Sequence, residues 1–252
     1  MRHAPVIAAL ACLLAAAPAA AAPPAGWTPE VDAARAFADG RAGEVSFDVR
    51  TENEHWSLDA DRPVASASVV KAMLMLAYLD RRAVRTRALR PADHALLDPM
   101  IRRSDNVAAT RVRDIVGNGA LRRVAERAGM TRFATHPTWG LSRITARDQT
   151  RMWLHFEDLV PRRHRAVAME LLRTIVPKQR WGIAKAPLPA GWRLHFKGGW
   201  GSGTGLVDHQ VALLRRGDER VALAILTTGS PDHAYGKRTL RGVATRLLRD
   251  LP

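Results

Sequence analysis

An apolar segment of sixteen residues, VASASVVKAMLMLAYL (residues 64–79), constrains the fold of this chain more than any other feature. It contains no acid, no proline and no glycine, and it is apolar on every face. Such a pattern is typical of a helix buried in the middle of a domain. Its one charged residue, Lys71, lies three positions after Ser68, although lysines are rarely buried without a partner.

The rest of the chain alternates between helical and strand-like patterns. Period-two alternation predicts strands at residues 44–51, 56–58, 192–197, 206–214 and 220–228. Helical spacing predicts helices at residues 27–39, 96–100, 107–116, 120–128, 146–156, 164–176 and over the C-terminal residues from Leu240 to Leu251. Short turns between successive strands predict an antiparallel sheet.

The order of these elements predicts an α/β (α+β) fold in a single domain at residues 23–252. One antiparallel sheet is expected from both ends of the chain, at about residues 27–65 and 192–252, flanked by N- and C-terminal helices. An all-helical lobe at about residues 66–191 is inserted in it. A site between the two lobes is expected.

The N-terminal residues are typical of a secretory signal. A positive start (MRH) precedes an apolar run at residues 6–17 and small residues that suit cleavage near Ala22. We therefore expect residues 1–22 to be removed and the protein to be secreted or extracytoplasmic. The run is shorter than a membrane span needs, and no later segment qualifies. The only cysteine, Cys12, lies inside this run, where lipid attachment is the less favoured alternative, and the mature chain then has no thiol for a disulfide or a metal.

The chain is strongly basic, with a formal net charge of +15. Only five of its 39 basic residues are lysines. The favoured explanation is an arginine-rich codon usage, and the alternative is attraction to a polyanion. The arginines form no long basic run interleaved with aromatic residues, so no specific binding of nucleic acid is expected.

Ser68 and Lys71 form an S-x-x-K pair, which places both side chains on one face of a helix. Backbone N–H groups at a helix N-terminus favour developing negative charge. An amine held in a dry site loses basicity and accepts a proton from a neighbouring hydroxyl at neutral pH. The alternative is that Ser68 caps the helix and Lys71 extends to solvent, as isolated pairs of this kind usually do.

Two further motifs follow in order, Ser104-Asp105-Asn106 and Lys197-Gly198-Gly199. The three motifs together resemble the S-x-x-K, S-D-N and K-x-G signatures of class A β-lactamases and penicillin-binding proteins. LLDPMIRRSDNVAATRV and ITARDQTRMW are similar to further segments of this superfamily, and the resemblance covers nearly the whole mature chain.

The resemblance implies a role for each matched residue. Ser68 would be the nucleophile that forms an acyl-enzyme, and Lys71 its general base. Ser104 would pass a proton to the leaving nitrogen. The remaining implied residues are Lys197 as a cation near the substrate carboxylate, the N–H groups of Ser68 and Trp200 as the oxyanion hole, Asn106, Gly198 and Gly199 as substrate-binding residues, and Asp105 as a structural residue.

The sequence departs from the superfamily pattern in three places. Residues 134–147 (ATHPTWGLSRITAR) contain no Asp or Glu where class A enzymes have a water-activating glutamate, and His136 is the only titratable base in reach. Gly198 replaces the usual hydroxyl after the lysine. Only 36 positions separate Ser68 from Ser104, which predicts a more open site. His209 is expected either to face the site beside Lys197, to pair with Asp208, or to be a partly exposed strand residue.

These observations favour a secreted serine hydrolase acting on amide, cell-wall peptide or β-lactam substrates, with weak β-lactamase activity. A DD-peptidase-like or penicillin-binding protein is a comparable alternative. A catalytically idle cell-wall binding protein and a cationic adhesion protein are the rivals from other classes. No cofactor is expected, the nine histidines show no metal-binding spacing, and a monomer is expected.

Overall fold

The computed structural model describes residue 24 and residues 26–252 of the chain. The predicted signal at residues 1–22, with Cys12, lies outside the described residues. Among the described helices, none combines the length and the apolar character needed to cross a membrane.

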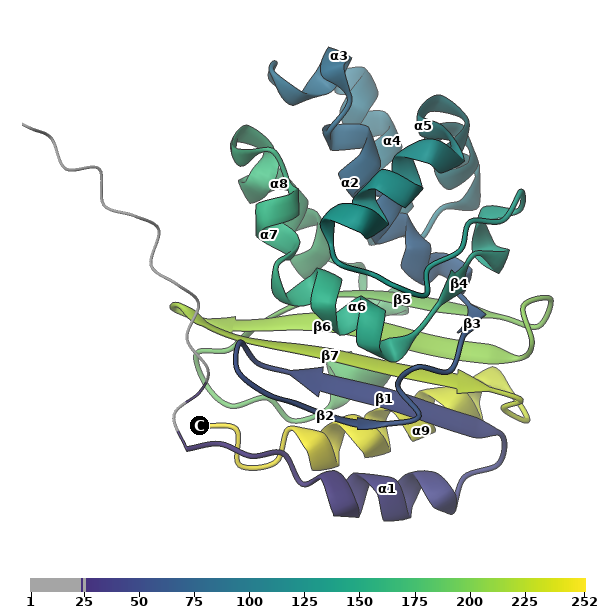
Figure 1. Ribbon diagram of the computed structural model, residues 1–252, viewed down its shortest axis with the longest axis vertical. Coiled ribbons are helices and arrows are strands. Elements are labelled where there is room, and N and C mark those ends of the chain that lie inside the picture. The colour runs from purple at the N-terminus through teal and green to yellow at the C-terminus, as the bar shows by residue number, and fades with distance from the viewer. Residues whose placement is uncertain (1–23, 25) are drawn as a thin grey trace, which may run out of the picture.

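A five-stranded antiparallel sheet with the order β2-β1-β7-β6-β5 runs through the middle of the molecule (Figure 1). The strands are β1 (Glu44–Arg50), β2 (His55–Leu58), β5 (Arg193–Gly201), β6 (Val207–Arg216) and β7 (Glu219–Thr228). β1 pairs with β7 along its whole length, from Glu44 opposite Thr228 to Arg50 opposite Ala222. The predicted sheet from both ends of the chain is therefore confirmed.

Two helices, α1 (Val31–Asp39) and α9 (His233–Leu247), lie side by side on one face of the sheet (Figure 1). The helical spacing near the C-terminus places Leu240, Val243 and Leu247 on one face of α9, and all three are fully buried. The Asp232 carboxylate accepts a hydrogen bond from the Tyr235 N–H and so caps the start of α9. The two helices thus join both ends of the chain beneath the sheet.

The other face of the sheet carries the helices from the middle of the chain (Figure 1). These are α2 (Lys71–Leu79), α3 (Arg82–Arg85), α4 (Pro91–Arg102), α5 (Asn106–Arg127), α6 (Ala146–Leu154), α7 (Phe156–Leu159) and α8 (Arg165–Arg173). Three short 3-10 turns lie before or between these helices, η1 (Ala67–Val70), η2 (Trp139–Leu141) and η3 (Arg162–His164), and two more, η4 (Pro177–Gln179) and η5 (Gly182–Lys185), lie between α8 and β5. α6 packs on β1 and β7, and α8 packs on β5.

The apolar segment at residues 64–79 does enter the core, and all nine residues of α2 are buried. Burying each of its large apolar side chains contributes about 1.5–3 kcal/mol. The segment is not one continuous helix, however. Val64 and Ala65 form a two-residue strand, β3 (Val64–Ala65), which pairs with β4 (Arg143–Ile144). The interpretation of residues 64–79 as a helix therefore needs correction at its first two residues, because short apolar runs do not distinguish a buried strand from a buried helix.

The predicted break near Gly117 also occurs. Gly117 has φ 70° and ψ 164° inside α5, so the helix is divided at this residue. Only glycine adopts this backbone conformation without strain. Gly119 is helical, so of the two neighbouring glycines Gly117 makes the break in α5.

Candidate active site

Ser68 lies in η1, one turn before the start of α2, and its side chain is partly exposed. The preceding residue, Ala67, has φ 44°, a left-handed conformation that non-glycine residues adopt only with strain. Within the described part of the chain, the Ser68 hydroxyl has no hydrogen-bond partner. The tight turn therefore presents a free hydroxyl at the point where the helix begins.

Lys71 is fully buried, with an exposed fraction of 0%. Its Nζ donates to the Ser104 backbone oxygen at 2.5 Å, to Asn106 Oδ1 at 2.7 Å and to Ser104 Oγ at 3.3 Å. Burial lowers the pKa of Lys71 from 10.5 to about 7, and the carboxylate of Asp105 opposes this shift. An amine that titrates near neutrality accepts a proton readily at physiological pH.

Ser104 connects the two lysines of the site. Its φ of 58° is left-handed, and the next residue, Asp105, caps α5 by accepting a hydrogen bond from Ala108 N–H at 2.7 Å. This turn directs both the hydroxyl and the backbone carbonyl of Ser104 toward Lys71. The same hydroxyl accepts a hydrogen bond from Lys197 Nζ at 2.9 Å.

Lys197 projects from β5 and is almost fully buried. Its Nζ also donates to the Gly198 backbone oxygen at 2.7 Å. Burial, followed by the charge of Lys71, lowers the pKa of Lys197 well below 10.5. Four predicted residues, Ser104, Lys71, Asn106 and Lys197, are therefore joined in one hydrogen-bonded group.

β5 is an edge strand of the sheet, and η1 lies beside it. A Cβ atom on residue 199 would lie 2.7 Å from the Ser68 backbone nitrogen and 2.9 Å from that of Val69. Gly199 is therefore needed for the strand to approach the turn that carries Ser68. The contact holds the start of the apolar helix against the strand that carries Lys197.

The ring of Trp181, which no sequence motif predicted as part of the site, covers Gly198. A Cβ atom on residue 198 would lie 3.0 Å from Cζ2 of Trp181. The Gln210 side chain holds this tryptophan's loop, because its Nε2 donates to the Trp181 oxygen at 2.7 Å and its Oε1 accepts from Ile183 N–H at 2.5 Å. The position where the superfamily has a hydroxyl is thus lined by an indole.

The acid-free segment at residues 134–147 also contributes an indole. Lys71 Nζ lies 4.8 Å from the ring centroid of Trp139, within the range of a cation–π interaction. Trp139 Nε1 donates to Thr110 Oγ1 at 3.1 Å, which fixes the ring on α5. His136 is exposed, and its Nδ1 accepts a hydrogen bond from the Thr138 N–H at 3.0 Å. Its role as a water-activating base stays a prediction.

His209 lies apart from the hydrogen-bonded group, and its predicted exposed or site-facing position needs correction. The side chain is fully buried. Its Nε2 donates to the Ala65 oxygen at 3.0 Å, and its Nδ1 accepts from Thr227 N–H at 3.1 Å. Because β3 covers this face of β6, His209 ties the strand before Ser68 to the sheet and has no surface to offer a substrate.

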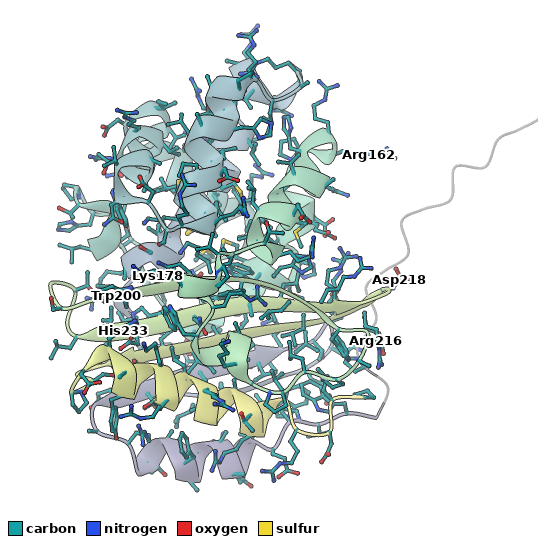
Figure 2. All side chains as sticks on the ribbon, turned by 180° about the vertical axis from the view of Figure 1, so that it is seen from behind. Arg162, Lys178, Trp200, Arg216, Asp218 and His233 are labelled. Carbon is teal, nitrogen blue, oxygen red and sulfur yellow. The ribbon has the colours of Figure 1, made fainter. Side chains whose placement is uncertain are left out.

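Trp200 and His233 form a further pair at the end of β5 (Figure 2). Their rings stack with centroids 4.4 Å apart, and the Trp200 side chain is 53% exposed. His233 Nδ1 hydrogen-bonds to Asp208, a buried carboxyl group whose pKa burial raises to about 7. His233 thereby supports one face of Trp200, and neither Asp208 nor His233 was predicted as part of the site.

Across residue 24 and residues 26–252, no group of three or more His, Cys, Asp or Glu side chains is arranged to hold a metal ion. The side chains described in the site carry two hydroxyls, two amines and an amide.

A family model described as "Beta-lactamase enzyme family" matches residues 89–251. The chain belongs to the beta-lactamase enzyme family. This confirms the resemblance stated from the motifs. The match includes Ser104, Asn106 and Lys197, and it begins after Ser68 and Lys71.

Solved structures support the same fold. A beta-lactamase from Sphaerobacter thermophilus DSM 20745 is 21% identical with a TM-score of 0.73, covering 88% of this chain and 97% of that one. A class A beta-lactamase from Mycobacterium abscessus is 19% identical with a TM-score of 0.73, covering 87% and 98%. A structure of PBP-A is 14% identical with a TM-score of 0.70, covering 87% and 94%. No curated protein matches the chain in sequence. At these identities the likeness shows the fold alone.

Proposed function

We propose that this member of the beta-lactamase enzyme family is an active serine hydrolase that transfers the acyl group of an amide, cell-wall peptide or β-lactam to Ser68. The observation that carries the proposal is the buried amine of Lys71, one helical turn from a free hydroxyl, with a pKa lowered to about 7. A lysine that served only structure would gain nothing from losing its charge in this way.

In the first step, Ser68 Oγ attacks the carbonyl carbon while its proton passes to the neutral Lys71 amine. The C–N bond of the resulting tetrahedral intermediate breaks, and the leaving nitrogen takes a proton. Ser104 is suited to relay that proton, because its hydroxyl is within hydrogen-bond distance of both Lys71 and Lys197. Asn106 orients Lys71 and contacts the substrate, and Lys197 adds positive charge beside Ser104.

The oxyanion is assigned to the backbone N–H groups of Ser68 and Trp200. An edge strand such as β5 leaves alternate N–H groups unpaired, and η1 lies beside it, which supports this assignment. The close approach of Gly199 to the Ser68 nitrogen supports it further. Gly198 and Gly199 would form the floor beneath the substrate.

Hydrolysis of the acyl-enzyme requires an activated water, and residues 134–147 supply no carboxylate for it. Trp139 lies over Lys71 from this segment instead. We therefore propose slow deacylation, so that a penicillin-binding or DD-peptidase-like activity is the second candidate. His136 is the remaining titratable group of the segment and the first residue to test.

The test is incubation with a fluorescent penicillin, followed by intact mass spectrometry over time. We expect one adduct per chain that persists for many minutes in the wild type and is absent in Ser68→Ala. Ser57→Ala, a serine on β2 at the other edge of the sheet, is the matched control and should label normally.

The outcomes separate the hypotheses. Rapid ring opening without an adduct would support acyl transfer but overturn slow deacylation, and His136→Ala would then be compared with the wild type. An adduct that persists in Ser68→Ala would overturn the assigned nucleophile. If neither a penicillin nor a fluorophosphonate reacts, the catalytically idle binding protein becomes the better explanation.

We also infer that the protein acts outside the cytoplasm as a monomer, after cleavage of residues 1–22. The positive start, the apolar run and the small residues near Ala22 support the export. N-terminal sequencing of the exported protein should begin just after Ala22. A cell-associated product that keeps Met1 would contradict the inference.

A further inference from the structure

A pocket of about 480 Å³ lies between α8, the start of β5 and the turn from β6 to β7. We call it the arginine pocket. Its charged and titratable lining residues are Arg165, Arg173, Arg193, Arg215, Glu157, Glu170 and His195. In Figure 2, the labelled residues Arg216 and Asp218 mark the end of the sheet where the pocket lies. Trp200 and His233 mark the opposite end. The pocket is therefore separate from the candidate active site.

The lining carries four guanidinium groups against two carboxylates. Glu170 is engaged by Arg173 in a two-point contact of 2.7 and 2.9 Å, and Glu157 is engaged by Arg215. Arg193 is exposed and makes no ion pair with any described residue. A guanidinium has five N–H donors, and a carboxylate uses only two of them. Arg165 pairs with Asp158, which does not line the pocket, so Arg193 and the unused N–H donors of the paired arginines are what the described residues leave available to an anion.

His195 provides an independent observation. Its side chain is 5% exposed, it lines the pocket, and its Nδ1 has no hydrogen-bond partner among the described residues. Burial, followed by the charge of Arg215, lowers the pKa of His195 to about 4, and a hydrogen bond with the Leu213 backbone opposes this shift. Buried polar atoms are nearly always partnered, so an unpartnered nitrogen in a wall of cations points to a missing ligand.

We propose that the arginine pocket binds an anion that carries two or more phosphoryl groups. Guanidinium groups pair with phosphate oxygens through two parallel hydrogen bonds, which suits a lining built from arginine rather than lysine. A water molecule occupies about 30 Å³ of liquid, so 480 Å³ exceeds the space that a single phosphate group needs. The bound oxyanion would supply the countercharge and a partner for His195.

The test is isothermal titration of the purified protein with sodium pyrophosphate, with sodium sulfate as reference at the same ionic strength. We expect saturable binding of pyrophosphate, and a shift of the His195 ring resonances in NMR spectra that follows the same saturation curve. Arg193→Gln should weaken binding about tenfold, because one charge-assisted contact is lost. This arginine pairs with no described carboxylate, so its removal should leave folding intact.

Arg241→Gln is the matched control, since Arg241 is an exposed arginine on α9 beneath the opposite face of the sheet. It should leave pyrophosphate binding unchanged. The proposal fails if pyrophosphate binds no better than sulfate, if both variants weaken it equally, or if the His195 resonances do not move. Competition by poly(glycerol phosphate) would identify a phosphate polymer as the ligand source, whereas binding of pyrophosphate alone would identify a small diphosphate.

Discussion

Lys71 and Lys197 are two of only five lysines in a chain that otherwise uses arginine. The Nζ atoms of both lysines donate hydrogen bonds to the Ser104 hydroxyl, and both side chains are buried. Arginine stays charged at any physiological pH, whereas a buried lysine loses its proton. A lysine at position 71 therefore suits the proposed general base in a way that an arginine would not.

The pH dependence of acylation follows from Lys71. Its pKa is lowered to about 7, and the neutral amine is the form that accepts a proton. The acylation rate of the wild type should therefore rise with pH through a midpoint near 7 and level off above it. Lys71→Arg keeps the charge and should slow acylation at least about a hundredfold. Lys178→Arg, at an exposed lysine, is the control, and stopped-flow labelling with a fluorescent penicillin is the measurement. A flat profile from pH 6 to 9 would argue against Lys71 as the base.

His209 makes a separate prediction about stability. Burial lowers its pKa from 6.5 to about 4, so the folded protein holds it neutral while the unfolded chain protonates it. Between these two pH values the unfolded state binds more protons, and the free energy of unfolding should fall as the pH falls. The titration of His209 contributes at most about 3 kcal/mol to this fall in the free energy of unfolding. Urea denaturation from pH 7 to pH 4 should show a shallower decline in His209→Gln, and equal slopes would show that His209 is not the titrating group.

The motifs predicted Ser104, Asn106, Lys71 and Lys197 as neighbours, and the structure joins them by hydrogen bonds. Trp181 was not predicted, because its contact with Gly198 crosses from η5 to β5 and leaves no local pattern in the sequence. His209 was predicted to face the site, to pair with Asp208 or to be partly exposed, since strand alternation does not reveal that β3 covers that face of β6. Local spacing in the sequence thus predicted the site residues that belong to motifs. The positions of Trp181 and His209 depend on long-range packing, which local spacing does not reveal.

At the scale of elements, the sequence predicted the strands of the five-stranded sheet and most helices, because their periodicity is regular over many residues. It did not predict that β3 precedes the turn at Ala67. Two apolar residues carry no periodicity, and Ala67 gives no sign of its left-handed φ. The turn is created by the pairing of β3 with β4 and by the contact of η1 with β5.

The break in α5 gives a prediction with an internal control. Gly117 has a φ of 70° that alanine adopts only with strain, so Gly117→Ala should destabilise the protein by about 1–3 kcal/mol. Gly119 is helical, and a Cβ atom there would meet only arginine side-chain ends at 3.6 Å or more. Gly119→Ala should therefore stabilise the protein by about 0.5–1 kcal/mol. Chemical denaturation of both variants measures the difference, and effects of the same sign would contradict the described helix break.

At the scale of the whole molecule, the helices on the upper face share their core with the sheet. The buried face of α6 packs on β1 and β7, and α8 packs on β5. The helical middle of the chain therefore has no complete core of its own. The lobe boundaries at residues 66 and 191 describe the chain order and imply no independent folding.

A fragment of residues 66–191 should accordingly fail to fold. Without the sheet, α6 and α8 would expose their apolar faces to water, which removes most of the hydrophobic stabilisation. We expect a poorly dispersed NMR spectrum and no cooperative thermal transition. The intact chain, measured in parallel, should show both dispersion and cooperativity. A well-dispersed spectrum of the fragment would establish the lobe as a domain in its own right.

The position of β1 between β2 and β7 also sets the moment at which the molecule can fold. Synthesis proceeds from the N-terminus, but β7, the second neighbour of β1, is complete only when Thr228 has been added. β1 and β2 can pair with each other early, but the other edge of β1 stays uncovered until β7 has been synthesised. Under the export proposed above, this late completion of the sheet would keep the precursor unfolded while it is translocated.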